Sequence, residues 1–131
     1  KVIEYLCDTE LESPHYLRLG RQPVEDIEMP FEFGKGQIVK DGNTLSSDIT
    51  LFSTGCILGD VINASKLIEN NTSYSVRVVN IPTLKPIDTD TIVECAKTSD
   101  ILFTVEDHSI IGRFIRKVWV ECWTNCKESF K

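Results

Sequence analysis

Two arginines, Arg18 and Arg21, lie close to prolines in the stretch PHYLRLGRQPV, residues 14–24. A guanidinium group offers paired N–H donors to phosphate oxygens and never loses its charge, so either arginine could bind an anion. Alternatively, Arg21 pairs with Glu25 or Asp26, an exposed contact that would contribute little to stability. If the segment is a strand, the two arginines point to opposite faces, and at most one of them lines a given pocket.

A second polar group, Glu106-Asp107-His108, follows the apolar run ILFTV. A histidine that titrates near neutrality beside two carboxylates could take part in acid–base chemistry. Neighbouring side chains in a strand alternate between faces, however, so three consecutive groups do not converge easily on one substrate atom. We therefore expect Glu106 and His108 to fix the following loop and to contribute to a domain interface, because structural ion networks also gather titratable groups. No catalytic residue is predicted.

The five cysteines do not form a metal-binding pattern. The only close pair, Cys122 and Cys126, is C-x3-C without a second pair or a nearby histidine, which does not match a zinc site. Cys56 precedes a helical pattern, where a thiolate is favoured, but without a partner histidine we interpret it as a packed thiol. Free thiols of this kind are typical of a cytoplasmic protein.

Composition narrows the function classes. The chain has 131 residues, 41% of them hydrophobic and 26% charged, which is ordinary for a globular protein with one core. Its net charge of −6 argues against general nucleic-acid binding, which requires a cationic face. No apolar run reaches membrane-spanning length, and the first residues lack a signal-peptide pattern. The sequence begins inside an amphipathic segment, so we expect further sequence upstream.

The pattern along the chain alternates between strands and helices. Residues 1–7 predict the end of a helix, 15–21 a strand and 23–30 an acidic linker. Further strands are predicted at 36–42, 48–55, 74–81 and 100–108, and helices at 56–71 and 90–99, the second one capped by Asp88 or Thr89.

This order predicts an α/β fold, a three-layer sandwich with a mostly parallel (mixed) sheet and helices on both faces. In such sheets ligands gather at the carboxyl ends of the strands. Three segments that follow strands, 54–55, 84–86 and 106–108, are therefore expected at one edge.

Several of these segments carry a family resemblance. The stretches ITLFSTGCILGDVINASKLIE, VRVVNIPTLKPID and ILFTVEDHSIIG resemble, in order, the C-terminal domain of transketolases. That family has a strand ending in a Ser/Thr-Gly turn, a strand ending in KPxD, and a strand ending in EEH or EDH. YLRLGRQ is similar to the last strand of the preceding pyrimidine-binding domain. The resemblance implies that residues 1–22 end that domain, 23–35 form a linker, and 36–131 form the C-terminal domain.

The resemblance also implies a function. Transketolases transfer a two-carbon ketol unit between sugar phosphates, using thiamine diphosphate and Mg²⁺. Arg21 matches the arginine of the family's SRQ or TSR segment, which binds the substrate phosphate, and this match favours the anion role. Arg18 has no such match and is interpreted as structural.

The family's cofactor ligands lie upstream of the region matched here. We therefore expect this chain alone to bind no cofactor or metal and to be inactive. It would serve dimer assembly together with the remainder of the enzyme or with a separate N-terminal subunit. The alternatives are a 2-oxo-acid dehydrogenase beta subunit, a deoxyxylulose-phosphate synthase, or a free-standing anion-binding module.

The end of the chain departs from the family pattern. Residues 1–112 contain 9 Lys and Arg against 18 Asp and Glu, whereas residues 113–131 contain 5 against 2. This change indicates either a reading-frame slip or a divergent basic helix with Phe114, Val118 and Cys122 as an apolar stripe. In both cases we expect no final strand and one exposed sheet edge. Either the whole fragment should then self-associate, or much of residues 113–131 should be poorly ordered.

Overall fold

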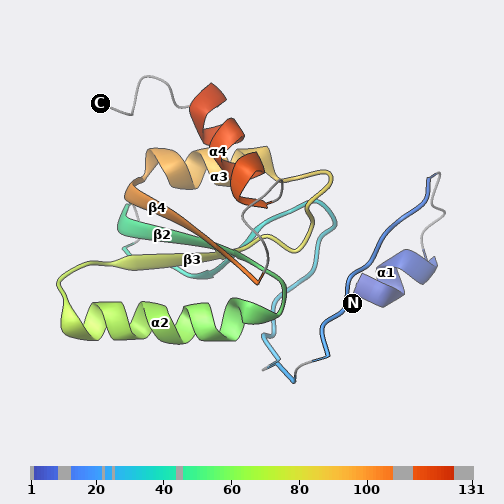
Figure 1. The fold of residues 1–131 in the computed structure, drawn as a ribbon, viewed down its shortest axis with the longest axis horizontal. Coiled ribbons are helices and arrows are strands. Elements are labelled where there is room, and N and C mark those ends of the chain that lie inside the picture. Colours follow the sequence, from blue (N-terminus) through green and yellow to red (C-terminus); the bar gives the residue numbers. More distant parts are fainter. Residues whose placement is uncertain are drawn as a thin grey trace.

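The computed structural model describes residues 2–8, 13–21, 23–24, 26–43, 46–107 and 114–125. A four-stranded sheet in the order β1-β3-β2-β4 forms its centre, with α2 on one face and α3 and α4 on the other (Figure 1). The strands are β1 (Gln37–Lys40), β2 (Ser47–Thr54), β3 (Val76–Asn80) and β4 (Ser99–Glu106). The helices are α1 (Val2–Asp8), the short 3₁₀ helix η1 (Gly55–Ile57), α2 (Leu58–Asn71), α3 (Thr89–Lys97) and α4 (Phe114–Asn125). The predicted α/β three-layer sandwich is confirmed.

The sheet is mixed, as predicted. β2 pairs in parallel with both β3 and β4, whereas β1 pairs antiparallel with β3. The connection from β2 to β3 contains α2, and the connection from β3 to β4 contains α3. Parallel strands need such long crossover connections. Side chains alternate along β2, so that Ile49 and Leu51 pack toward α2 while Phe52 packs toward α3 and α4.

The predicted strand at 15–21 is wrong. Residues 14–20 belong to no strand, and none of them pairs with another strand among the described residues. A strand is stable only where its N–H and C=O groups meet a neighbouring strand. The alternating pattern alone therefore did not decide the structure. The predicted N-terminal helix is confirmed as α1, whose Tyr5 stacks on Phe33 with ring centroids 5.2 Å apart.

The tail forms a helix in its described part. Phe114, Val118 and Cys122 of α4 are all buried and pack with Ile92 and Ala96 of α3 in one apolar cluster. The helix with this apolar stripe is confirmed, and so is the expectation that residues 114–125 form no strand. The expectation of poor order is wrong for residues 114–125, because a stripe at four-residue spacing finds an apolar surface to cover.

In the parts of the chain that the structure describes, no helix has both the length and the apolar character needed to cross a membrane.

The burial of the α4 stripe generates a first prediction. Phe114→Ala should lower the free energy of unfolding by about 3 kcal/mol, because it removes a fully buried ring and leaves a cavity. Trp119→Ala on the exposed side of the same helix should change it by less than about 0.5 kcal/mol. Urea unfolding measures both values, and equal effects would show that α4 is not packed through this stripe.

Candidate functional site

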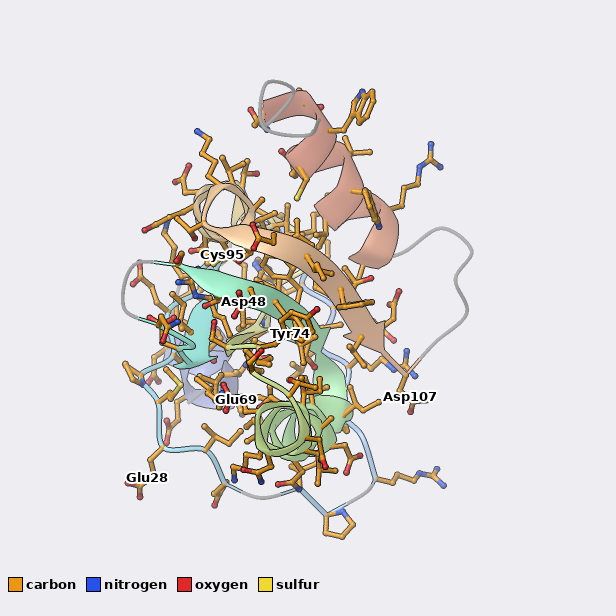
Figure 2. All side chains as sticks on the ribbon, turned by 90° about the vertical axis from the view of Figure 1, so that its left-hand side faces the viewer. Glu28, Asp48, Glu69, Tyr74, Cys95 and Asp107 are labelled. Carbon is orange, nitrogen blue, oxygen red and sulfur yellow. The ribbon has the colours of Figure 1, made fainter. Side chains whose placement is uncertain are left out.

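The carboxyl ends of the parallel strands meet at one edge of the sheet. Thr54, the last residue of β2, is opposite Glu106, the last residue of β4. The Thr54 hydroxyl donates a hydrogen bond of 2.8 Å to the carbonyl of Ile81, just after β3. Figure 2 shows Asp107 beyond the tip of β4, far from Asp48 and Cys95 at the other end. The predicted gathering of strand ends is confirmed for these residues.

The turn after β2 leads directly into the starts of two helices at this edge. Gly55 has φ of +80°, a left-handed conformation that favours glycine. The chain then enters η1 and α2, and neither of their N-cap residues, Thr54 and Ile57, makes a side-chain cap hydrogen bond. Uncapped N–H groups at a helix start attract water or an anion. The turn therefore supplies donors beside the strand ends.

The segment that contains Arg21 crosses the same edge. A Cβ atom built on Gly20 would lie 2.0 Å from Sγ of Cys56, so the backbone of Gly20 lies directly against this thiol at the start of η1. Arg21 follows Gly20 and is exposed. Among the described residues, no ion pair joins Arg21 to a carboxylate, Asp26 included. Glu25, the other predicted partner, lies outside the described residues.

The remaining predicted site residues are only partly brought together. Glu106 is partly buried and Asp107 is exposed, whereas His108 lies outside the described residues. Arg18 is exposed and two residues away from the contact at Gly20. The role of Glu106 and His108 at a domain interface stays a prediction.

A buried carboxylate fastens the end of the linker to this edge. Asp88, 4% exposed, accepts hydrogen bonds from the Gly36 N–H at 2.8 Å and from the Thr91 hydroxyl at 2.7 Å. Its other oxygen accepts from the Thr91 N–H and caps α3. The sequence predicted the cap but not the hydrogen bond to Gly36. The glycines at 34 and 36 could have suggested that the backbone there comes close to another group, such as Asp88.

The surroundings of Asp88 set its protonation. Burial alone would raise the pKa of this carboxyl, but the hydrogen bonds from Gly36 and Thr91, with the Lys35 ammonium 3.7 Å away, hold its pKa below the usual range. Asp88 is therefore charged in the folded protein at neutral pH. It acts as an anchor for residues 34–36 and not as a general acid.

A second buried polar cluster lies at the amino ends of the strands. Arg77, 5% exposed, donates from Nε to Asp41 and from Nη1 to Thr98, both at 2.8 Å. Burial would lower the pKa of Arg77, but the Asp41 carboxylate keeps it above its ordinary value. Burial also raises the pKa of the Cys95 thiol, and the nearby Arg77 only partly opposes this. The sequence pattern does not reveal this cluster, because it joins three segments that are distant in the chain: the end of β1, β3 and the end of α3.

Within the described residues, no three His, Cys, Asp or Glu side chains gather closely enough to hold a metal ion. The carboxyl edge instead holds the starts of η1 and α2, and Gly20, the neighbour of Arg21, contacts Cys56 there.

Comparisons with known proteins agree on one family. The family model of the transketolase C-terminal domain matches residues 34–131. A putative transketolase C-terminal section from Methanocaldococcus jannaschii is 38% identical over 108 residues, covering 79% of this chain and 32% of that relative. A pyruvate dehydrogenase E1 component subunit beta from Staphylococcus epidermidis is 32% identical over 97 residues, covering 74% and 28%.

A solved structure has the same fold. A split-gene transketolase, in an inactive beta4 tetramer, matches 99% of this chain and 41% of its own with a TM-score of 0.78 and 28% identity. The chain spans about a third of the length of the curated relatives that it matches.

The environment of Asp88 predicts a pH-dependent stability. Its pKa is lowered by folding, so its contribution is complete above the unfolded pKa of about 3.9 and is lost as pH falls through the lower folded pKa. Asp88→Asn should cost about 1–3 kcal/mol at pH 7. The difference from the parent chain should shrink below pH 4. Urea unfolding at several pH values measures it, with the 93% exposed Asp90 changed to Asn as the control, which should show almost no effect.

The contact between Gly20 and Cys56 predicts a change in thiol reactivity. Gly20→Ala places a methyl group where Sγ of Cys56 lies, so the segment or the thiol must move. Labelling of Cys56 by a thiol reagent, followed by peptide mass spectrometry, should then become several-fold faster. Gly59→Ala is the control because a Cβ there meets open space. Unchanged labelling in Gly20→Ala would contradict the placement of residues 13–21 at this edge.

Proposed function

Because the chain belongs to the transketolase C-terminal domain family, we propose that it is the C-terminal section of a transketolase, which transfers a two-carbon ketol unit between sugar phosphates. The family match over residues 34–131 and the 38% identity to a putative transketolase C-terminal section support this function. The rest of the enzyme is either further sequence of the same protein or a separate N-terminal subunit. That part would bind thiamine diphosphate and Mg²⁺, so this chain would be inactive by itself.

We propose that Arg21 binds the phosphate group of the sugar substrate in the assembled enzyme. Three observations support this role. Arg21 is exposed next to the contact of Gly20 with Cys56, at the edge where strand ends meet. Uncapped N–H groups of η1 and α2 lie at the same edge. The guanidinium group also has the fork geometry that suits phosphate oxygens.

We also propose that the chain associates with copies of itself, at least as a dimer, in the cytoplasm. The beta4 assembly of the split-gene transketolase supports self-association. Cytoplasmic location is supported by Cys7, Cys56, Cys95 and Cys122, which are all free thiols, as in a reducing compartment.

A second candidate is the beta subunit of a 2-oxo-acid dehydrogenase. It is favoured by the 32% identity to a pyruvate dehydrogenase E1 component subunit beta. Co-expression with the section encoded upstream tests both candidates in one experiment. The purified assembly should transfer ketol units between sugar phosphates, with no activity from either part alone. Decarboxylation of a 2-oxo acid without ketol transfer would favour the second candidate.

The role proposed for Arg21 predicts a selective defect. In the assembled enzyme, Arg21→Ala should lower kcat/KM for phosphorylated sugars. The corresponding loss of transition-state stabilisation should be about 1.5–3 kcal/mol, the scale of a charge-assisted hydrogen bond. Unphosphorylated analogues should lose much less, because they lack the group that Arg21 binds. Arg18→Ala, which removes the other exposed arginine of this segment, should leave both substrate types unchanged. Equal losses for both types in Arg21→Ala would show that Arg21 does not bind the phosphate.

A further inference from the structure

We propose that β4 is an interface strand, along which a second copy of this chain adds its own β4 and continues the sheet across a two-fold axis. The proposal assigns a surface to the self-association proposed above and rests on it. β4 pairs with β2 on one side, and within the described residues no strand pairs with its other side. In Figure 1, β4 is the outermost strand on the side of β2 away from β3.

The two edges of the sheet differ in their protection against pairing. β1 has only four residues, ends in Lys40 and contains a register shift between Ile38 and Lys40. Short length, a lysine and an irregularity all discourage a further strand. β4 has eight residues without lysine or proline, and its register with β2 is regular from Ile101 to Glu106. The β4 edge is therefore the one suited to accept another strand.

β4 also exposes apolar side chains at this edge. Ile101 and Phe103 are 41% and 52% exposed. They lie opposite Ile49 and Leu51 of β2, on the face of the sheet covered by α2. Because α2 packs mainly on β2 and β3, it leaves these two side chains uncovered. A second sheet edge would bury them.

The sequence of β4 is complementary to itself when two copies run antiparallel. Along a strand, the backbone N–H and C=O groups of every second residue point toward the free edge. Two residues directly opposite each other in an antiparallel pair must therefore either both direct these groups toward the partner strand or both direct them away from it. This condition is met when the two-fold axis passes through the point between one residue and the same residue of the second copy. With the axis at Leu102, Ile101 of each copy lies opposite Phe103 of the other, and such cross-strand apolar pairs stabilise a sheet.

The charges select this register over its neighbours. With the axis at Leu102, Asp100 lies opposite Thr104 of the second copy. An axis at Phe103 would place Asp100 opposite Glu106, and like charges directly opposite are destabilising. An axis at Ile101 would place Asp100 opposite Leu102 and would separate the Ile–Phe pairs. The register centred on Leu102 therefore fits both the apolar and the charged side chains.

The outer side of α4 is a second exposed apolar surface, formed by Trp119, Val120 and Trp123. These residues point away from the buried stripe of the helix, and nothing in the structure indicates what would cover them. A substitution on this outer side of α4 therefore provides a control for substitutions in β4.

Sedimentation equilibrium of the 131-residue chain tests the proposal. The chain should dimerise, and Ile101→Lys and Phe103→Lys should each weaken the dimer by about tenfold or more, because each removes two cross-strand pairs per interface. Ile38→Lys is the matched control, since Ile38 is 42% exposed on the opposite edge strand, and it should leave the dimer unchanged. Trp119→Lys on α4 should also leave it unchanged. Circular dichroism checks that each variant is folded.

Hydrogen exchange of the unmodified chain gives a readout that needs no substitution. Amides of β4 should exchange more slowly as protein concentration rises through the dimerisation range, whereas those of β1 should not. A monomer at every concentration, or a dimer lost only in Trp119→Lys, would overturn the proposal. So would β4 amides whose exchange is independent of concentration. The transketolase assignment is tested separately by ketol transfer with the upstream section, so its failure is distinguishable from this one.

Discussion

The burial of β2 on both faces is the constraint on which the rest of the structure depends. Phe52 and Ser53, neighbours that point to opposite faces, are both 0% exposed. A strand buried in this way needs a helix layer on each face and a paired strand on each side. α2 supplies one layer and α3 the other, while β3 and β4 pair with β2 in parallel. The other elements attach to this unit.

The two ends of the sheet are closed by different polar groups, and this difference distinguishes the carboxyl edge, where we propose ligand binding, from the amino ends. At the amino ends, Arg77 is enclosed by Asp41 and Thr98 and has little contact with solvent. At the carboxyl ends, Asp88 fastens Gly36 and caps α3, but the start of α2 stays uncapped. The starts of η1 and α2 therefore lie at the same edge as the segment of Arg21, to which we assign phosphate binding.

The same buried unit explains the exposed surfaces. α4 adds to the α3 face through one stripe, and its opposite side carries Trp119 and Trp123 in solvent. On the other face, α2 is centred on β2 and β3, which leaves Ile101 and Phe103 of β4 uncovered. Exposed apolar area at an outer strand or an outer helix is the kind of surface on which another chain can pack.

The sequence by itself determined the order of elements from β1 to β4 and the Asp88 cap of α3, because these follow from local periodicity and local hydrogen bonds. It also determined the family, through motifs that are short and continuous. It left two alternatives for the tail, since a stripe such as Phe114, Val118 and Cys122 forms a stable helix only where an apolar surface receives it.

Only the tertiary structure decided the features that join distant segments. Residues 15–21 alternate like a strand but have no neighbour to pair with in the described chain. The contacts of Gly20 with Cys56, of Asp88 with Gly36 and of Arg77 with Asp41 and Thr98 each connect positions at least 20 residues apart. Such contacts arise from the packing of layers around β2. No period in the sequence encodes them, because periodicity reports which face of an element is buried and not what lies against it.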